Sequence, residues 1–564
     1  MNANPSEHYV NVFFSSKTIE LMERELILQP GGSPDTLMVN LIARLARAEK
    51  QLGEAHRNTD SVLAAFYDFT RRGLCTLGSP LLTNIAAGRQ TLGSCSAVPI
   101  DVGALSASDL DLAEAYYNLN MGSGYDLTDS PDPCDTLLRL NRHATRVENS
   151  GSCERYVGNI AHLSVHHPRV LEFIEVKRGR EDIVHFNISV DVTKEFMRAL
   201  FAGAYVRMSD GTELASRDIW DAIVAGAWEC GDPGIIALER YNQGNALRAH
   251  APYVTTAPCA EVGLSPGETC VFAYINLAAC LRATPRLGVD LELVGDVAAC
   301  LTRVLDDAVE ANLNAFPTAA STSVVAAKRK IGIGLCGLAD ALLWLGVPYA
   351  SPESARLLAD VLATLNYRSK EASLQLAERR GPFLSFHLSE YQHNTDFLSR
   401  FGKVESVIGP STWNALAKKV SRHGLRNVMT TALPPSGRSA LLLGVNPSIE
   451  PYLSFRDDND FVMPVQMLLS TGQVRLADNL GKIADNGAGR PEDVFRTAAE
   501  IAPEEHLSLL RIAAGVVDDG VSKTINLPPH ATPESISDIF QAAWDAGLKA
   551  ISVYRVGSRN PQVS

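Results

Sequence analysis

The chain has 564 residues, 46% of them hydrophobic and 20% charged, and its 51 Lys and Arg against 64 Asp and Glu give a net charge of −13. This composition is typical of a folded protein with a large core. The acidic balance argues against a general surface for nucleic acids or anionic membranes. Ten cysteines without a CxxC pair are too few for a disulfide scaffold and do not indicate structural zinc or another metal site.

The first 75 residues are predicted to be helical. Residues 33–55 begin with a Ser-Pro-Asp capping signal and then repeat apolar residues at spacings of three and four. The amino-terminal sequence lacks a basic and then apolar leader, and apolar runs such as 440–445 are far too short to cross a bilayer. We therefore expect a cytoplasmic protein with a small helical segment over residues 1–75.

From about residue 77, short apolar runs bounded by turn formers alternate with long helical patterns. Long helices are predicted within 294–316 and 351–381. Strands are predicted within 90–102, 183–192, 252–262, 268–278, 425–433 and 548–556. Strands separated by helices favour a largely parallel sheet, so we expect one catalytic α/β domain over residues 76–564.

Residues 255–278 contain the most informative side chains. In an extended strand, Ala257, Cys259 and Glu261 share one face, so a thiol and a carboxylate lie on the same wall. The turn signal at 265–267 would fold the following strand back, so that Cys270 approaches the first strand. The alternative is that the thiols are packed core groups and that Glu261 is a solvated edge charge.

Two further segments carry candidate chemistry. Cys95 lies in a predicted strand introduced by Gly-Ser, where a packed core thiol is again the alternative. Residues 430–451 hold a loop with two prolines followed by Ser436, Gly437, Arg438 and Ser439. A helix beginning near Ser439 would offer free backbone N–H groups, hydroxyls and a guanidinium to a phosphate, although the pattern is also that of an ordinary turn.

In this order along the chain, the motifs resemble those of the catalytic subunit of ribonucleotide reductases. The resemblance extends nearly from end to end and rests on SPLLTNIAAGRQTLGSCSAVPID, HHPRVLEFIEVKRG, HFNISVDVTKEFM, AWECGDPGIIALERYNQGN, APCAE, ETCVFAYINLA, KRKIGIGLCGLADALLWLGVPY, LRNVMTTALPPSGRSALLLGVNPSIEP, VSKTINLPP and GLKAISVYRVGSR. It implies a ten-stranded α/β barrel. SKTINLP and YRVGSR favour the adenosylcobalamin-dependent class II enzymes, since the oxygen-dependent class carries paired tyrosines where this chain has Tyr554 and Arg555.

The resemblance implies a role for each matching residue. Cys259 would become the thiyl radical, started by adenosylcobalamin, and Glu261 would act as general base for the ribose 3′-hydroxyl. Cys95 and Cys270 would deliver two electrons and close to a disulfide. The positions matched to substrate contacts are Ser79, Ser94, a glycine-rich turn of Gly122, Ser123 and Gly124, Ala257, and a phosphate loop of Pro435, Ser436, Gly437, Arg438 and Ser439.

The chain departs from the family at three presumed substrate contacts. Ala257 replaces an Asn that contacts the ribose, Ala260 replaces a Gly, and Arg438 replaces a small polar residue. Losing one positioned hydrogen-bonding group commonly lowers the rate by roughly 100-fold to 1,000-fold. The C-terminal cysteine pair of many relatives does not follow YRVGSR, so either an external thiol such as thioredoxin would reduce Cys95 and Cys270, or turnover does not consume this pair.

The leading prediction is reduction of a ribonucleoside di- or triphosphate to the deoxyribonucleotide. Radical modification of a specialised nucleotide is one alternative, because the altered residues lie where specificity is set. A catalytically silent nucleotide-binding homologue is the other, although the three retained thiols argue against it. The expected partners are the ribonucleotide and the thiol reductant, and the family allows a homodimer.

Overall fold

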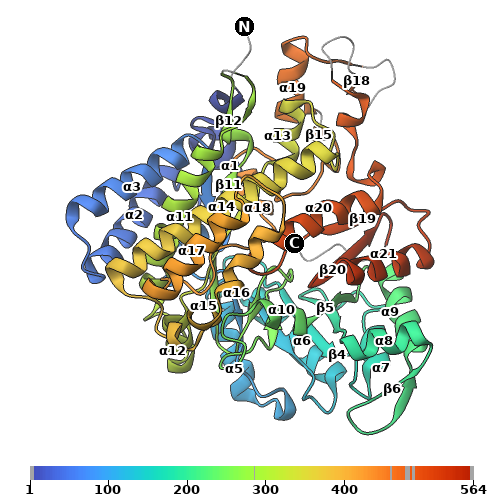
Figure 1. Ribbon diagram of the computed structural model, residues 1–564. Coiled ribbons are helices and arrows are strands. Elements are labelled where there is room, and N and C mark those ends of the chain that lie inside the picture. The colour runs from blue at the N-terminus through green and yellow to red at the C-terminus, as the bar shows by residue number, and fades with distance from the viewer. Residues whose placement is uncertain (1–4, 285, 458–459, 477–482, 485–489, 559–564) are drawn as a thin grey trace.

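A computed structural model describes the chain over residues 5–284, 286–457, 460–476, 483–484 and 490–558. Its main sheet has ten strands (Figure 1). They are β1 (Cys75–Leu77), β2 (Cys95–Ala97), β3 (Gly122–Asp126), β4 (Asn159–Ser164), β5 (Phe186–Asp191), β8 (Gly234–Ile236), β11 (Thr269–Asn276), β14 (Ile331–Cys336), β19 (Thr524–Leu527) and β20 (Ala550–Arg555). This confirms the predicted ten strands of the α/β fold.

The strands form two parallel groups that run in opposite directions. β2, β3, β4, β5 and β8 pair parallel in that order, β11 pairs parallel with β14, and β19 pairs parallel with β20. The groups meet in antiparallel pairs, β2 with β11 and β8 with β20, and β1 also pairs antiparallel with β11. The expectation of a largely parallel sheet therefore holds within each group but not between them.

Two isolated bridges connect the remaining edges of the sheet. Ile333 of β14 bridges Thr431, and Leu433 bridges Val521, which lies three residues before β19. The predicted strand at 425–433 is wrong as a continuous strand, because only these two bridges form there. Through these bridges, residues 431–433 connect β14 to the segment before β19, so the strands form a ring. Residues in the middle of this ring are surrounded by strands.

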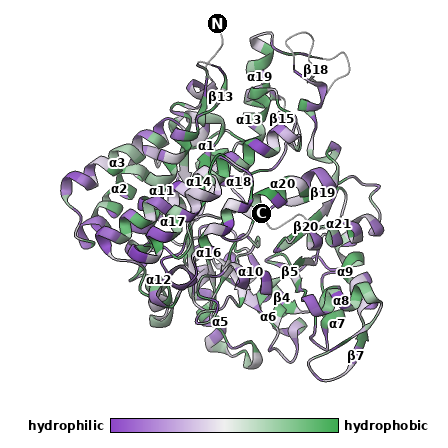
Figure 2. Ribbon diagram, viewed as in Figure 1, coloured by the Kyte–Doolittle hydropathy of each residue, from purple (hydrophilic) through white to green (hydrophobic). Residues whose placement is uncertain are grey.

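Helices cover the outside of the sheet, and in Figure 2 they carry both hydrophilic and hydrophobic residues. They are α1 (Ser16–Arg24), α2 (Pro34–Gln51), α3 (His56–Arg71), α4 (Ser79–Ala86), α5 (Ala107–Tyr117), α6 (Pro133–Ser150), α7 (Val170–Glu175), α8 (Lys194–Ala202), α9 (Ser216–Cys230), α10 (Leu238–Gly244), α11 (Leu291–Asn312), α12 (Ala319–Lys328), α13 (Leu338–Leu345), α14 (Pro352–Arg380), α15 (Glu390–His393), α16 (Thr395–Ser399), α17 (Pro410–His423), α18 (Gly437–Leu441), α19 (Met463–Ser470), α20 (Pro503–Val516) and α21 (Pro533–Asp545).

The capping signals explain where the predicted helices begin and end. Ser33 accepts a hydrogen bond from Thr36 N at the start of α2, and Ser351 caps α14 in the same way. The long helix α14 ends before Gly381, whose φ of 81° is readily adopted only by glycine. The helices of residues 1–75 share one continuous hydrophobic core with the rest of the chain, and the division at residue 75 stays a prediction.

Short strand pairs complete the described structure. They are β6 (Tyr205–Arg207) with β7 (Glu213–Ala215), β9 (Thr255–Thr256) with β10 (Gly263–Leu264), β12 (Leu281–Arg282) with β13 (Gly288–Val289), β15 (Arg456–Asp457) with β16 (Asp460–Phe461), and β17 (Arg475–Leu476) with β18 (Ile483–Ala484). Of these, the β9–β10 hairpin matters for function because its connection holds Cys259 and Glu261. None of the helices among the described residues is both long and apolar enough to span a bilayer.

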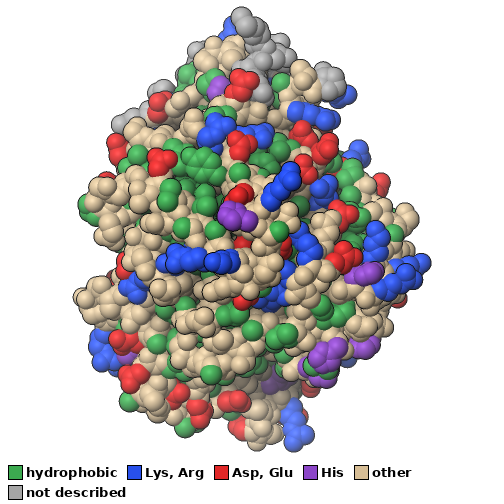
Figure 3. Space-filling model, turned by 90° about the vertical axis from the view of Figure 1, so that its left-hand side faces the viewer, with side chains coloured by type: hydrophobic (Ala, Val, Ile, Leu, Met, Phe, Trp, Pro, Cys, Tyr) green, Lys and Arg blue, Asp and Glu red, His purple; other side chains and the backbone are tan. Residues whose placement is uncertain are grey.

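The surface shows no separation of charge on the face drawn in Figure 3, where acidic and basic side chains are interspersed. Binding to nucleic acid depends on clustered Lys and Arg. The expectation from the net charge, that nucleic acids are not general partners of this protein, stays a prediction.

Candidate active site

The segment with Cys259 and Glu261 is a tight loop and not the predicted strand. Only Thr255–Thr256 is extended, and residues 257–262, called the active-site loop below, connect β9 to β10. Ala257 N donates to Val262 O at 2.9 Å, and Ala260 N donates to Ala257 O at 2.9 Å. The geometry of this loop, and not the alternation of side chains along a strand, therefore sets the positions of Cys259 and Glu261.

At Ala260, which replaces a Gly of the family motif, the backbone conformation makes the difference between the two residues important. Its φ is 59°, in the left-handed region that glycine enters freely and that strains a residue with a Cβ. We expected only a steric effect of the added methyl group. The structure adds backbone strain of roughly 1–2 kcal/mol to that expectation.

The active-site loop is held from one side by the first group of strands. His162 Nε2 on β4 lies 3.0 Å from Val254 O, and Asn187 Nδ2 on β5 donates to Pro258 O at 3.3 Å. On β3, a Cβ at Gly122 would lie 2.8 Å from Pro258 Cγ, and one at Gly124 would lie 2.0 Å from Thr256 O. These two glycines let the loop approach the strand.

This placement corrects the prediction for residues 122–124. They begin strand β3 and are not a turn. Gly122 and Gly124 face the loop, and since side chains alternate along a strand, the Ser123 side chain points to the opposite face. The structure therefore brings the two glycines to the site, but not the Ser123 hydroxyl.

Groups from the second side of the ring hold the other half of the loop. Gly520 N donates to Glu261 O at 2.9 Å, and Lys330 Nζ donates to Gly263 O at 2.6 Å. The buried Tyr241 hydroxyl donates to Ala260 O. A Cβ at Gly520 would lie 2.5 Å from Ala260 O. Because contacts come from both groups of strands, the active-site loop lies inside the ring.

Cys95 and Cys270 face each other across two antiparallel strands. They are direct Cα partners between β2 and β11, which places their side chains on the same face. Both are free thiols. The strand of Cys270 does not pair with the 252–262 segment, because the turn at 265–267 leads into β11 and β11 pairs with β2. Cys270 nevertheless lies within the electrostatic influence of Glu261, as the predicted approach of the two segments requires.

The loop and the cysteine pair meet at Glu261. Cys95 Sγ donates to Glu261 Oε1 at 3.7 Å, and Cys95 also interacts electrostatically with Cys259 and Cys270. Glu261 is 2% exposed, and its Oε2 has no hydrogen-bond partner among the described residues. The structure thus brings together the four predicted catalytic side chains, which come from three separate segments of the chain.

The electrostatics of the site keep its thiols protonated. Burial, followed by the nearby Glu261 carboxylate, raises the pKa of Cys95 and of Cys259, and burial raises the pKa of Cys270. A cysteine nucleophile needs the opposite shift, because the thiolate is the reactive form. The arrangement therefore favours chemistry of the S–H bond over nucleophilic attack.

Glu261 is suited to exchange protons near neutral pH. Burial raises its pKa to about 7, against the lowering effects of hydrogen bonds from its own and neighbouring backbone groups and from Cys95. A carboxylate whose pKa lies close to the working pH is an efficient general base. Its Oε2, which has no partner among the described residues, keeps its lone pairs available to a proton donor.

The predicted phosphate loop is folded next to the start of α4. Ser79 N donates to Ser439 Oγ at 3.0 Å, and Ser436 Oγ accepts from Ser448 N at 2.7 Å. The helix of this loop, α18, has five residues and begins at Gly437, two residues before the predicted start. Arg438 does not point to open solvent, since its Nε lies 3.1 Å from Glu25 Oε2.

A large cavity opens beside the active-site loop. It has a volume of about 1320 Å³, and Pro258, Cys259 and Ala260 line one end of it together with Pro435 and Gly437. Ala257 is fully buried and lies outside its described lining. Ser94 also lies outside this lining; it is 2% exposed, and its Oγ lacks a partner among the described residues.

The residues that position the loop were missed from the sequence. Tyr241, Asn187, Lys330 and Gly520 lie far from Cys259 along the chain and belong to no motif that we singled out for chemistry. For Gly520, the available signal was its position two residues before the sequence SKTIN at 522–526. Their role depends on the ring of strands, which sequence spacing does not describe.

Comparison with known proteins identifies relatives of this chain. Residues 128–554 match the family described as "Ribonucleotide reductase, barrel domain". The chain is 31% identical to the "Vitamin B12-dependent ribonucleoside-diphosphate reductase" of Mycobacterium tuberculosis, over 96% of this chain and 79% of that protein. It is also 31% identical to the protein of the same name from Thermoplasma acidophilum, over 76% of this chain and 55% of that protein. The "Ribonucleoside-diphosphate reductase large subunit" of Caenorhabditis elegans is 27% identical, over 64% of this chain and 48% of that protein.

Proposed function

The chain belongs to the ribonucleotide reductase family, and from this premise we propose that it reduces the 2′ carbon of a ribonucleotide and releases the deoxyribonucleotide. The observation that carries the proposal is the meeting of Cys259, Glu261 and the opposed Cys95 and Cys270 inside the ring of strands. Relatives named ribonucleoside-diphosphate reductases favour a diphosphate substrate.

Adenosylcobalamin is the proposed cofactor, because several relatives are named vitamin B12-dependent. The cavity of about 1320 Å³ supports it, since a single drug-sized ligand usually occupies roughly 300–1,000 Å³. The exposed apolar side chains of Leu441 and Leu453 and the half-buried Phe461 line this cavity and would hold the cofactor. When bound, adenosylcobalamin supplies the radical that starts the reaction.

In the proposed mechanism, the Cys259 thiol gives up its hydrogen atom and the resulting thiyl removes hydrogen from the ribose 3′ carbon. Glu261 accepts the proton of the 3′-hydroxyl. Cys95 and Cys270 then supply two electrons and two protons, so that the 2′-hydroxyl leaves as water and a disulfide forms. Cys259 then returns the abstracted hydrogen atom to the 3′ carbon, which completes the deoxyribonucleotide and regenerates the thiyl. The raised thiol pKa values support this sequence, because each sulfur enters it as S–H.

An external dithiol such as thioredoxin would reopen the disulfide. Thiol–disulfide exchange requires access to one sulfur. Cys95 keeps part of its surface exposed whereas Cys270 is fully buried, so we propose that the reductant attacks Cys95.

The test combines the purified protein with adenosylcobalamin, dithiothreitol and each of the common ribonucleoside di- and triphosphates. We expect deoxynucleotide and 5′-deoxyadenosine by chromatography, loss of both in Cys259→Ser, and normal turnover in Cys134→Ser, which removes a half-buried thiol on α6. Absence of deoxynucleotide from every substrate would refute the proposal. Exchange of the 3′ hydrogen without deoxynucleotide would instead support modification of a specialised nucleotide.

A further inference from the structure

The outer edge of strand β10 lies two residues from Glu261. Ala257 N donates to Val262 O at 2.9 Å, and the next pair in the β9–β10 hairpin is Thr256 with Gly263. Hydrogen-bonded and non-hydrogen-bonded pairs alternate along antiparallel strands, so the N–H and C=O groups of Gly263 point away from β9. Gly263 is buried, and these two groups therefore need partners from outside the hairpin.

Two charged side chains take the place of a third strand at this edge. Gly263 N donates to Asp519 Oδ2 at 3.0 Å, and Gly263 O accepts from Lys330 Nζ at 2.6 Å. The two side chains come from segments far apart in the chain, since Asp519 follows α20 and Lys330 precedes β14. Hydrogen bonds with a charged partner are stronger than those between neutral groups, so Gly263 is held more firmly than strand pairing would hold it.

Both side chains are buried, and each has an ion-pair partner. Asp519 is 2% exposed, and its Oδ1 lies 3.4 Å from Lys549 Nζ. Lys330 is 1% exposed, and its Nζ lies 3.1 Å from Glu268 Oε1. Buried ion pairs add little stability, because desolvation of the charges offsets their attraction. Stability of the hairpin alone therefore does not account for the two charges.

Asp519 acts on Glu261 both through the backbone and through its charge. Its neighbour Gly520 donates from N to Glu261 O at 2.9 Å, so residues 519–520 hold the chain at Glu261 and at Gly263. Burial raises the pKa of Glu261 to about 7, and repulsion from the Asp519 carboxylate adds to this rise. The hydrogen bonds fix where the Glu261 carboxyl lies, and the charge affects how strongly this carboxyl holds a proton.

The titratable groups around Glu261 and Asp519 differ in charge near neutral pH. Burial raises the pKa of the thiols and phenols among them, which therefore stay neutral; they are Cys95, Cys259, Cys270, Tyr241, Tyr253, Tyr274 and Tyr391. The cations that face these groups or Asp519 are Arg155, Lys328, Lys330 and Lys549. Among these neighbours, Asp519 carries the negative charge that repels the Glu261 carboxylate.

We propose that Asp519 and Lys330 are positioning residues for the general base Glu261. Their hydrogen bonds to Gly263 fix the loop so that the Glu261 carboxyl stays beside Cys95. The Asp519 charge also keeps the proton affinity of Glu261 high enough for it to accept a proton from the substrate hydroxyl near neutral pH. This inference rests on the proposed function, in which Glu261 is the general base, and extends it to two residues outside the reacting groups.

Titration of Glu261 by infrared difference spectroscopy tests the charge effect without cofactor or substrate. The C=O band of the protonated carboxyl is assigned by its loss in Glu261→Gln, and its midpoint in the wild type should lie at about pH 7. Asp519→Asn should move the midpoint lower by about 0.5–1 pH unit, because the repelling charge is gone.

Asp518→Asn is the matched control, since Asp518 is the adjacent buried carboxylate but has a different set of contacts. Its Oδ2 lies 2.5 Å from Lys370 Nζ and accepts from Thr430 N and Thr431 N at 2.9 Å each. This variant should lose stability as Asp519→Asn does, but it should keep the Glu261 midpoint at about pH 7. The comparison separates the effect of charge on Glu261 from a general loss of structure.

Steady-state kinetics of two Lys330 variants test the positioning. Lys330→Met and Lys330→Gln both remove the charge, but only Gln keeps an N–H group that donates to Gly263 O. We expect Lys330→Met to lower kcat about tenfold to a hundredfold with an unchanged KM, because the general base is displaced while the substrate still binds. Lys330→Gln should recover part of this loss.

A Glu261 midpoint that is equal in the wild type and Asp519→Asn, or that moves as far in Asp518→Asn, would overturn the charge effect. Equal kcat values of the wild type and Lys330→Met, or equal losses in the two Lys330 variants, would overturn the positioning. If the midpoint moves as expected but the wild type forms no deoxynucleotide, the effect of Asp519 on Glu261 stands and the proposed function fails. If deoxynucleotide forms and the midpoint does not move, the proposed function stands and the role of Asp519 fails.

Discussion

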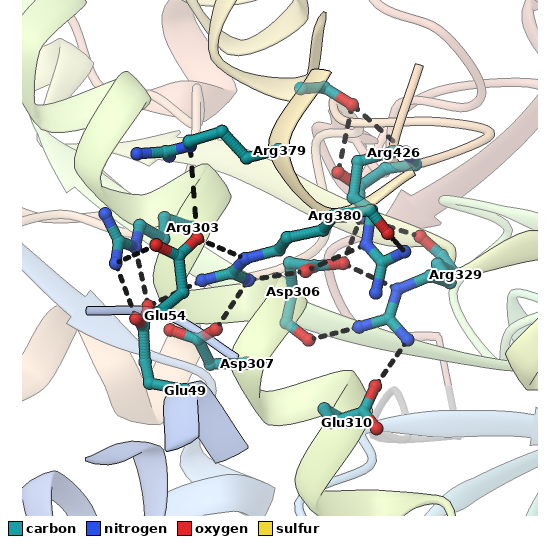
Figure 4. A network of polar contacts seen from close by, with 12 residues as sticks. Glu49, Glu54, Arg303, Asp306, Asp307, Glu310, Arg329, Arg379, Arg380 and Arg426 are labelled. Carbon is teal, nitrogen blue, oxygen red and sulfur yellow. Dashed lines mark hydrogen bonds and ion pairs between the residues drawn. The ribbon is translucent and has the colours of Figure 1, made fainter. Parts of the chain in front are cut away.

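Buried charged side chains are fully paired at one place in this molecule and keep unpaired atoms at another. Around Arg380 on α14, whose side chain is 1% exposed, every guanidinium nitrogen has a carboxylate partner (Figure 4). Nε meets Glu54 at 2.8 Å, Nη1 meets Asp306 and Asp307 at 2.8 Å each, and Nη2 meets Glu49 at 2.7 Å. At the active site, by contrast, Glu261 Oε2 and Arg155 Nε have no partner among the described residues.

The pKa values follow the same division. Burial alone would raise the pKa of Glu49, yet hydrogen bonds from Arg303 and Asp307 and the charge of Arg380 lower it to about 2. Glu261 lacks such cations, and burial raises its pKa to about 7. The Arg380 network joins α2, α11 and α14 and is structural, whereas the active site leaves polar atoms free for a ligand.

The largest effect is expected from Glu261→Gln, which removes the ionisable carboxyl group from the active site. We expect the rate of deoxynucleotide formation to fall about 10²- to 10⁴-fold, as for loss of a general base. In the wild type, the rate should rise with pH up to about 7 and then level off, because Glu261 must be deprotonated to accept the proton. The variant should lack this rise, and Glu213→Gln, on the exposed strand β7, should keep it.

The raised pKa of Glu261 also predicts how the free energy of unfolding changes with pH. Folded Glu261 holds its proton up to about pH 7, whereas in the unfolded chain it titrates near 4.5. The unfolded state then binds fewer protons between these values, so the contribution of Glu261 to stability falls as pH rises through this window. Urea unfolding of the wild type and Glu261→Gln at several pH values measures the difference, and parallel pH profiles would contradict it.

The contribution of the Arg380 network to stability is tested by Arg380→Gln. This change leaves Glu49, Asp306 and Asp307 without their shared cation, and breaking a buried pair typically lowers the free energy of unfolding by about 3–5 kcal/mol. Arg379→Gln is the matched control, because its side chain is 43% exposed and lies 3.9 Å from Glu54, so the expected loss is below about 1 kcal/mol. Similar denaturation midpoints for the two variants would show that the Arg380 network does not stabilise the fold.

A smaller effect is expected at Gly520, which touches the active-site loop but contributes no chemistry. The Cβ of Gly520→Ala would lie 2.5 Å from Ala260 O, so the loop with Cys259 must shift. A misplacement of about 1 Å can lower a rate about 10²-fold. Gly409→Ala should be neutral, since nothing lies within 4 Å of its Cβ. A Gly520→Ala enzyme with an unchanged kcat would remove Gly520 from the support of the loop.

The smallest expected effect is from Ala260→Gly, which relieves the backbone at φ 59°. The free energy of unfolding should rise by about 0.5–1 kcal/mol, after allowing for the greater flexibility of glycine in the unfolded chain. Ala199→Gly, inside α8, should instead lower it by about 1 kcal/mol. A loss of stability in Ala260→Gly would mean that neighbouring contacts, and not backbone strain, determine the effect of this residue.

Several elements could be predicted because their signals are local. The start of α2 at Pro34 and the end of α14 at Arg380 follow from capping residues that act on the nearest backbone groups. β5 and β11 follow from apolar runs that strands bury on both faces, and β20 follows from an apolar alternation in which Ile551 and Val553 are buried. Motif order along the chain was also enough to indicate the family and the three cysteines of the site.

Other elements could not be read locally. The segment 252–262 has the alternation of a strand but folds as a hairpin with a tight loop, because His162, Asn187, Tyr241 and Gly520 take up its backbone groups from elsewhere in the ring. Gly122 and Gly124 resemble a turn, yet they lie in β3 where a neighbouring loop leaves no room for a Cβ.

By itself, the sequence determined the start of α2, the end of α14, the strands β5, β11 and β20, and which residue types are available for radical and acid–base chemistry, since propensity, capping and motif order act over a few residues. Only the tertiary structure decided that Cys95 stands opposite Cys270 and that Glu261 meets Cys95. Those proximities arise from the pairing of strands far apart in the chain, and burial in the resulting ring sets the protonation of each group.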